Sequence, residues 1–219
     1  MSEFEVPPER LGAWLRRWAH EHDAIRTETR PGHVTFTGAD GAQVVAAPPF
    51  PPLGPAATVE AFAPDALLAH VTRDRIVGVL LVRLGGYAAG VFHGKRLVDS
   101  KVGRRPVHGR TSAGGQSQKR YERRRDGQSR VAHDAAAEAG AGILLRHFDD
   151  LEAVVLGGDR FALASVLEDP RLRKLTRLTS ERVLDVPDPR LAILRSTPDR
   201  YRATLLRTLD ARGAPELGA

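Results

Sequence analysis

The first apolar positions of the chain recur at the spacing of an amphipathic helix. They lie within residues 8–23, which open with prolines suited to a first helical turn. The members of this stripe are Leu11, Trp14, Leu15 and Trp18. We therefore predict a helix here, and we expect its two tryptophans to anchor a core rather than to form a base-stacking platform.

A strand-like pattern follows the predicted helix. Residues 33–37 alternate between apolar and polar, and turn residues separate them from a second extended run at 43–47. The proline-rich stretch 48–55 interrupts both kinds of pattern. We therefore predict a small N-terminal α+β subdomain, residues 1–55, formed by a helix and a β-hairpin, and a second domain over residues 56–219.

The second predicted domain begins with three runs of strand-forming residues, at 75–84, 87–94 and 95–102. Glycines separate the first two runs and also the second and third, so we read them as sequential antiparallel strands. The chain then becomes polar and basic, and after this segment it regains a helical stripe that extends to about residue 148.

The remaining residues alternate between strand and helix patterns. Residues 151–156 read as a buried strand, 160–167 as a helix, 182–186 as a strand, and 189–209 as a final helix. Together with the preceding three strands this predicts an α/β (α+β mixed sheet) fold.

Composition excludes several classes of protein. The chain has no cysteine, so disulfides, thiolate metal sites and a cysteine nucleophile are excluded. No stretch reaches the roughly 18 apolar residues of a membrane span, and the acidic start does not resemble an export signal. We expect a cytoplasmic protein with no membrane partner.

Arginine dominates the positive charge. Of the 33 basic residues 29 are Arg, and the net charge is +6. Guanidinium groups bind phosphate oxygens in bidentate fashion and stack on bases, so an RNA or DNA partner is favoured, although a GC-rich genome also produces arginine-rich proteins.

The candidate catalytic element is Gly114-Gly115-Gln116, in the polar basic segment between a strand and a helix. Two glycines allow the backbone to approach a substrate closely. The glutamine amide can orient a water molecule, and its backbone N–H can stabilise an oxyanion. These groups suit hydrolysis of an activated ester such as that of peptidyl-tRNA.

Basic residues surround this element. We expect them to bind phosphates of the tRNA CCA end or of ribosomal RNA. They are Arg110, Lys119, Arg120, Arg123 and Arg124. We also expect the loop over residues 104–118 to be mobile in the free protein, because few apolar side chains there offset the entropy of ordering.

The order of these features resembles the central domain of eukaryotic and archaeal class-1 release factors. The resemblance covers residues 76–195 and includes strands, the run HGRTSAGGQSQKRYERRR, a long helix and LEAVVLGGD. It implies an RNase-H-like sheet, with Gln116 matching the catalytic-loop glutamine, and Gly114, Gly115 and Ser117 matching its neighbours. We include Ser117 among the RNA-binding residues.

Two departures narrow the family. Residues 111–113 separate His-Gly-Arg from Gly-Gly-Gln, which the termination factors join directly. We expect neither a stop-codon-reading domain ahead of the matched region nor a partner-binding domain behind it. The sequence therefore resembles a stand-alone member of the VLRF family, the release-factor-like peptidyl-tRNA hydrolases of ribosome quality control. That resemblance implies peptidyl-tRNA and the large ribosomal subunit as partners.

Alternatives to ester hydrolysis stay open. A metal-independent endonuclease could cut tRNA near its CCA end, and a non-catalytic ribosome- or rRNA-binding factor would need the basic helix but not Gln116. The sequence does not decide between a split subunit and an intact stalled ribosome, and it leaves the role of the N-terminal subdomain open. We expect a monomer that needs no cofactor.

Two further sets of residues have structural readings. The histidines show no ligand pattern with carboxylates, so we expect no metal site; they are His93, His108, His133 and His147. The turn 157–159 could bind phosphate, but we interpret it as a strand-to-helix turn with Asp159 as N-cap.

Overall fold

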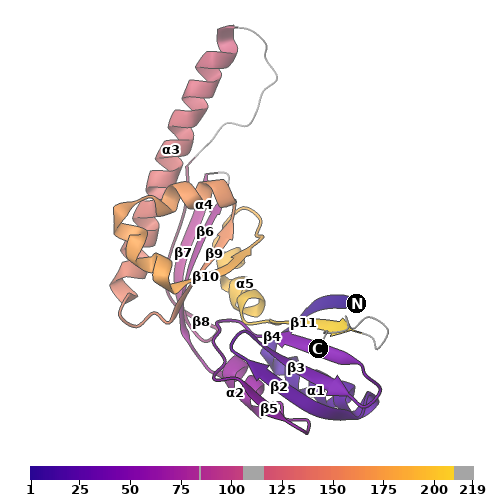
Figure 1. Ribbon diagram of the computed structural model, residues 1–219. Helices are drawn as coiled ribbons and strands as arrows, with labels where there is room; N and C mark the ends of the chain where they lie inside the picture. The colour runs from indigo at the N-terminus through magenta and orange to yellow at the C-terminus, as the bar shows by residue number, and fades with distance from the viewer. Residues whose placement is uncertain (84, 106–115, 210–219) are drawn as a thin grey trace. The chain divides into compact units, whose positions relative to one another are not determined.

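The computed structural model describes residues 1–83, 85–105 and 116–209, and for residues 116–126 it describes the backbone alone. The chain divides into two compact units (Figure 1). Unit 1 comprises Met1–Arg73 and Asp199–Ala219, and unit 2 comprises Asp74–Pro198. From the sequence we placed a single domain boundary after residue 55. In the structure, unit 1 extends to Arg73, and the chain returns to unit 1 after Pro198.

Unit 1 places two helices on one face of a sheet. Helix α1 (Pro8–Glu21) begins at a proline and buries Leu11, Leu15 and Trp18, and helix α2 (Asp65–Thr72) buries Leu67 and Val71. All five side chains belong to one apolar cluster. The predicted first helix and the packing role of Trp18 are therefore confirmed.

The sheet of unit 1 is antiparallel and has the strand order β1-β11-β4-β3-β2-β5. Its strands are β1 (Ser2–Val6), β2 (Ala24–Arg30), β3 (His33–Gly38), β4 (Gln43–Ala47), β5 (Ala57–Val59) and β11 (Thr204–Leu209). The β3–β4 hairpin confirms the one predicted from alternation. The sequence analysis missed β1, β2 and β5, which are polar or short.

Unit 2 contains a mixed five-stranded sheet of order β10-β9-β6-β7-β8. Its strands are β6 (Ile76–Arg83), β7 (Gly86–His93), β8 (Arg96–Arg104), β9 (Ala153–Gly158) and β10 (Thr179–Leu184). The pairs β6–β7 and β7–β8 are antiparallel, as predicted, while β9 pairs in parallel with both β6 and β10. The mixed α/β fold class is confirmed.

Helices cover both faces of this sheet (Figure 1). On one face lie α3 (Gln116–Leu144), α4 (Arg160–Leu167) and the 3-10 helix η2 (Pro170–Leu178), whose apolar residues share one cluster with the sheet. A short 3-10 helix, η1 (Leu145–His147), follows α3. On the other face lies α5 (Leu191–Tyr201), whose Leu194 side chain packs over Gly90 of β7.

The predicted final helix over residues 189–209 is wrong in its second half. Helix α5 ends at Tyr201, and Thr204–Leu209 form the strand β11. This strand pairs on one side with β1 and on the other with β4. Because both partners lie in the first 47 residues, long-range pairing decided the structure of this segment, and its local sequence did not reveal that pairing.

Candidate functional site

The candidate site begins at one end of the unit 2 sheet. Because β6, β8, β9 and β10 run in the same direction, their carboxyl ends lie at the same end of the sheet. We call this the loop end; it is defined by Arg83, Arg104, Gly158 and Leu184, the last residues of those strands. The segment that contains Gly114-Gly115-Gln116 leaves the sheet here, after β8.

The structure places the predicted site residues along the chain without giving side-chain geometry for any of them. Arg110, Gly114 and Gly115 lie outside the described residues, as does most of the loop that we expected to be mobile. Gln116 is the first residue of α3. The other predicted RNA-binding residues, Ser117, Lys119, Arg120, Arg123 and Arg124, follow it on the helix backbone, with side chains outside the described part.

Helix α3 connects this segment to the core. With 29 residues it is about 43 Å long, and its first turns continue past the loop end of the sheet (Figure 1). Among the α3 side chains that the structure describes, the buried ones begin at Ala132 and are mostly alanine, which lets the helix approach β7 closely. His133 adds a polar link, with Nδ1 3.0 Å from Ser165 Oγ of α4. Contacts with β7 and α4 therefore hold the second half of α3 in place, and the first half projects from it.

Arginines at the loop end fall into two groups. Arg83 donates to Asp185 at 3.1 Å and to the Val186 carbonyl at 2.8 Å, which ties β6 to the segment after β10. Arg104 lies 3.5 Å from Asp188. By contrast, Arg105 and Arg160 have no carboxylate partner among the residues that the structure describes.

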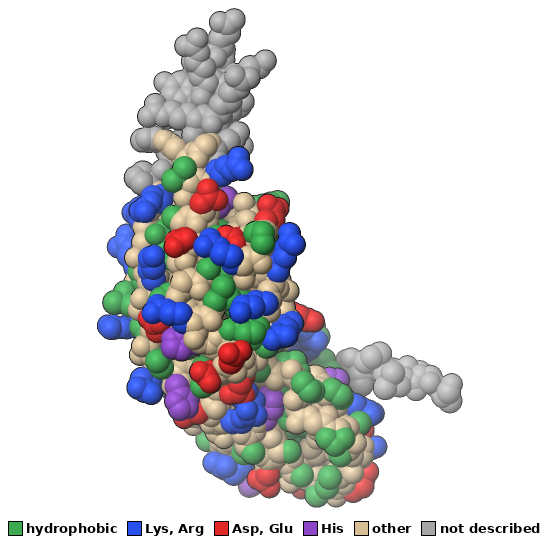
Figure 2. All heavy atoms as spheres, turned by 90° about the vertical axis from the view of Figure 1, so that its left-hand side faces the viewer, with side chains coloured by type: hydrophobic (Ala, Val, Ile, Leu, Met, Phe, Trp, Pro, Cys, Tyr) green, Lys and Arg blue, Asp and Glu red, His purple; other side chains and the backbone are tan. Residues whose placement is uncertain are grey.

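Positive charge is concentrated in unit 2. This unit holds 23 Lys and Arg against 15 Asp and Glu, a net charge of +8, while unit 1 has a net charge of −2. Figure 2 shows Lys and Arg side chains spread over the described face of unit 2. Such a field attracts polyanions and accelerates their association.

The turn after β9 is structural. Asp159 Oδ1 accepts a hydrogen bond of 2.9 Å from the Ala162 amide and caps α4, which confirms the predicted N-cap. Gly158 has φ of +108°, and a Cβ there would overlap the Val82 carbonyl of β6. The turn thus fixes where α4 begins and brings it close against β6.

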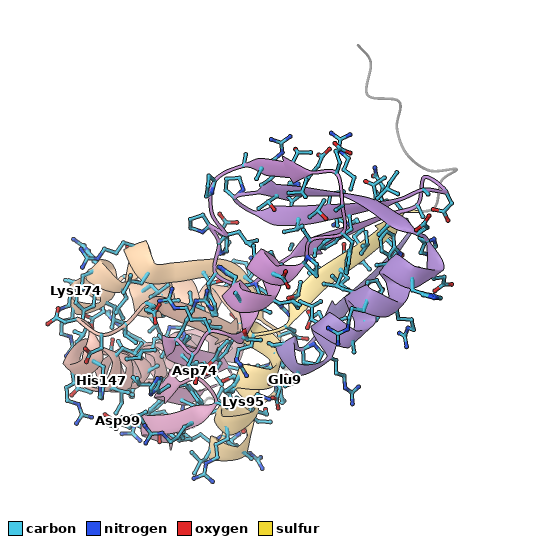
Figure 3. All side chains as sticks on the ribbon, turned by 90° about the horizontal axis from the view of Figure 1, so that it is seen from below. Glu9, Asp74, Lys95, Asp99, His147 and Lys174 are labelled. Atoms are coloured by element: carbon cyan, nitrogen blue, oxygen red, sulfur yellow. The ribbon has the colours of Figure 1, made fainter. Side chains whose placement is uncertain are left out.

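A second polar cluster lies at the other end of β8. His147 Nε2 and Arg146 NH2 each lie 3.1 Å from Asp99 Oδ2 (Figure 3). Nearby in the chain, Phe148 has Lys174 Nζ 4.1 Å and the Arg177 guanidinium 4.8 Å from its ring centroid. These contacts join the end of α3 to β8 and to η2.

Metal ligation has no candidate within the described ranges. No group of three or more His, Asp or Glu side chains with the geometry of a metal site occurs there. His133 and His147 instead contact a hydroxyl and a carboxylate, while His108 lies outside these ranges. Likewise, none of the helices described is long and apolar enough to cross a bilayer.

Comparison with known proteins assigns the chain to a family. Residues 75–207, more than half of the chain, match the family model described as Actinobacteria/chloroflexi VLRF1 release factor, and the chain belongs to this family. The resemblance inferred from the sequence is therefore confirmed. No curated protein sequence matches the chain.

Solved structures of translation factors are similar over most of the chain. The archaeal translation termination factor aRF1 is 17% identical, with a TM-score of 0.41, and the match covers 96% of this chain and 65% of that one. Archaeoglobus fulgidus Pelota is 14% identical, with a TM-score of 0.32, and the match covers 88% of this chain and 60% of Pelota. S. cerevisiae Dom34 is 7% identical, with a TM-score of 0.31, and the match covers 89% of this chain and 64% of Dom34. The chain thus spans less than two thirds of each of these relatives.

Sequence reasoning missed some features of the loop end. It did not single out Arg105, Arg160 or Phe161, whose side chain is 89% exposed at the start of α4. The helical pattern could have indicated this exposure. The apolar stripe of α4 consists of Ala162, Leu163 and Val166, and a phenylalanine at position 161 lies outside that stripe.

Proposed function

We propose that this protein is a peptidyl-tRNA hydrolase that releases nascent chains on stalled or split ribosomes through Gly114-Gly115-Gln116. One observation carries the proposal: this sequence stands at the start of a long, firmly packed helix, inside the range matched by the VLRF1 release factor family. The concentration of positive charge in unit 2 supports an RNA partner.

The start of α3 suits the chemistry of ester hydrolysis. The first N–H groups of a helix have no acceptor within it and carry partial positive charge, and Gln116 is the first residue of α3. These donors can stabilise the oxyanion that forms when water attacks the ester carbonyl carbon, while the glutamine amide orients that water. The bond to the tRNA 3′-oxygen then breaks, the oxygen takes a proton, and a free peptide acid leaves.

Binding would come from the residues around the motif. Arg110, Ser117, Lys119, Arg120, Arg123 and Arg124 are proposed to bind phosphates of the CCA end and of large-subunit rRNA. Helical spacing puts positions 119, 120 and 123 on the same side of the axis as position 116. We propose that a monomer acts in the cytoplasm, without metal or cofactor.

The decisive experiment compares variants on a defined substrate. Purified large subunits bearing peptidyl-tRNA are incubated with wild-type protein, with Gln116→Ala and with Gln128→Ala, a glutamine control on the same helix. We expect free peptide and intact CCA ends from wild type and Gln128→Ala, and at least about a 100-fold slower release with Gln116→Ala.

Other outcomes would replace the proposal. A shortened tRNA together with a peptide that carries nucleotides would identify an endonuclease. Release that is equally fast with Gln116→Ala would remove this residue from the mechanism, and absence of any release by wild type would favour a non-catalytic ribosome-binding factor.

A further inference from the structure

Phe161 is unusual among the aromatic side chains of this protein. Its side chain is 89% exposed, whereas every other Trp, Tyr and Phe side chain that the structure describes is buried or partly buried. An isolated phenyl ring in water contributes nothing to the packing of the fold. Its position therefore calls for an explanation outside the folded core.

The local structure holds Phe161 outward. The cap from Asp159 fixes the start of α4, and Ala162, Leu163 and Val166 then face the core. Since successive helical residues are rotated by about 100°, Phe161 in the first turn cannot share that buried face. The ring is thus presented from a helix whose start and orientation are both fixed.

Phe161 lies at the same end of the sheet as the GGQ segment. Helix α4 follows β9 directly, and β9 ends at the loop end, as does β8, from which the GGQ segment departs. The order β9-β6-β7-β8 separates the two strands by three spacings, or about 14 Å. Phe161 therefore lies at the end of the sheet beyond which α3 projects, with about 24 Å of helix between Gln116 and Ala132.

The charges beside the ring favour a nucleic acid over an apolar protein surface. Arg160 precedes Phe161 and has no carboxylate partner within the described residues. Arg105 follows β8, about 14 Å away across the sheet, and donates to the Arg104 carbonyl. The next exposed residue of α4 is Ala164, which adds little apolar area. A single exposed ring that follows an arginine without a described carboxylate partner suits a base that stacks and a phosphate that binds beside it.

We propose that Phe161 stacks on an unpaired nucleobase of large-subunit rRNA, with Arg160 binding an adjacent phosphate. The identity of this RNA rests on the proposed function. The contact would orient unit 2 so that the GGQ segment points toward the tRNA ester, which makes Phe161 a positioning residue.

The test measures binding of labelled protein to vacant large subunits, which carry no ester. We expect Phe161→Ala to weaken binding roughly tenfold or more, Phe161→Trp to retain it, and Phe161→Leu to weaken it as Ala does, because leucine keeps apolar area but has no π face. The control Ile25→Ala, at a half-exposed residue of unit 1, should bind like wild type. All three Phe161 variants should melt at the wild-type temperature, since the ring is exposed.

Three results would overturn the inference. Wild-type affinity of Phe161→Ala would show that the ring makes no contact, and full affinity of Phe161→Leu would indicate an apolar protein site instead. Failure of wild-type protein to bind vacant subunits would remove the rRNA partner. None of these outcomes requires hydrolysis, so the Gln116→Ala release assay judges the proposed function separately.

Discussion

Replacing Gly158 with alanine should strongly destabilise unit 2. Gly158 ends β9 opposite Val82 of β6, with φ of +108°, a conformation that L side chains rarely adopt. An alanine Cβ would overlap the Val82 carbonyl oxygen, which accepts the Asp159 amide at 2.9 Å. The obstacle is backbone, so it cannot move aside as a side chain could.

The magnitude follows from two contributions. The strained backbone costs about 1–3 kcal/mol, and separating β9 from β6 at this rung weakens at least one hydrogen bond, at about 1 kcal/mol or more. We expect a loss of about 2–4 kcal/mol, a large part of the roughly 5–15 kcal/mol that stabilises a domain. The matched control is Gly142→Ala in α3, where no atom lies within 4 Å of the new Cβ. It should stabilise the protein by about 0.5–1 kcal/mol.

Urea unfolding can follow the two units separately. Both tryptophans, Trp14 and Trp18, lie in unit 1, so tryptophan fluorescence reports that unit, while far-ultraviolet circular dichroism reports both. Gly158→Ala should lower the midpoint of the dichroism transition more than that of fluorescence. An unchanged dichroism midpoint, or equal effects of Gly158→Ala and Gly142→Ala, would refute the reasoning.

Two further predictions concern other parts of the fold. Asp159→Ala should cost about 1 kcal/mol by removing the cap on the Ala162 amide, and Asp159→Asn should retain most of it; equal urea midpoints for Asp159→Ala and wild type would contradict this. Burial raises the pKa of Tyr201, with nearby Arg202 opposing the shift more weakly. An unfolded tyrosine ionises at about pH 10. The contribution of neutral Tyr201 to the free energy of unfolding is therefore fully present below that pH and is lost as the pH rises above it. Measured against pH, the stability of Tyr201→Phe should fall less steeply there, and parallel curves would argue against the assignment.

Local patterns identified the elements whose packing is local. The hairpin β3–β4 and the strands β6 to β8 follow from strand-forming runs and turn residues, because each strand pairs with a neighbour close in sequence. The helix α4 follows from its own helical pattern. By contrast, β1 and β2 have few buried positions, so their polar sequences carry no alternating signal. β11 depends on partners at the opposite end of the chain.

The candidate site shows the same division. A motif singled out Gly114-Gly115-Gln116 from the sequence alone, and Gln116 is the first residue of α3. The position of Phe161 at the loop end could not be predicted in this way, because it depends on β9 and β8 running in the same direction. Strand direction is a property of the whole sheet, and the eight residues of α4 do not determine it.

The place of β11 between β1 and β4 in the unit 1 sheet sets an order for folding during synthesis. β1 pairs with β11 and with no other strand that the structure describes, so this pairing forms only after Thr204–Leu209 have left the ribosome. Residues 74–198 emerge earlier and contain every strand of the unit 2 sheet. The inserted unit can therefore fold first, and the unit that begins the chain is completed last.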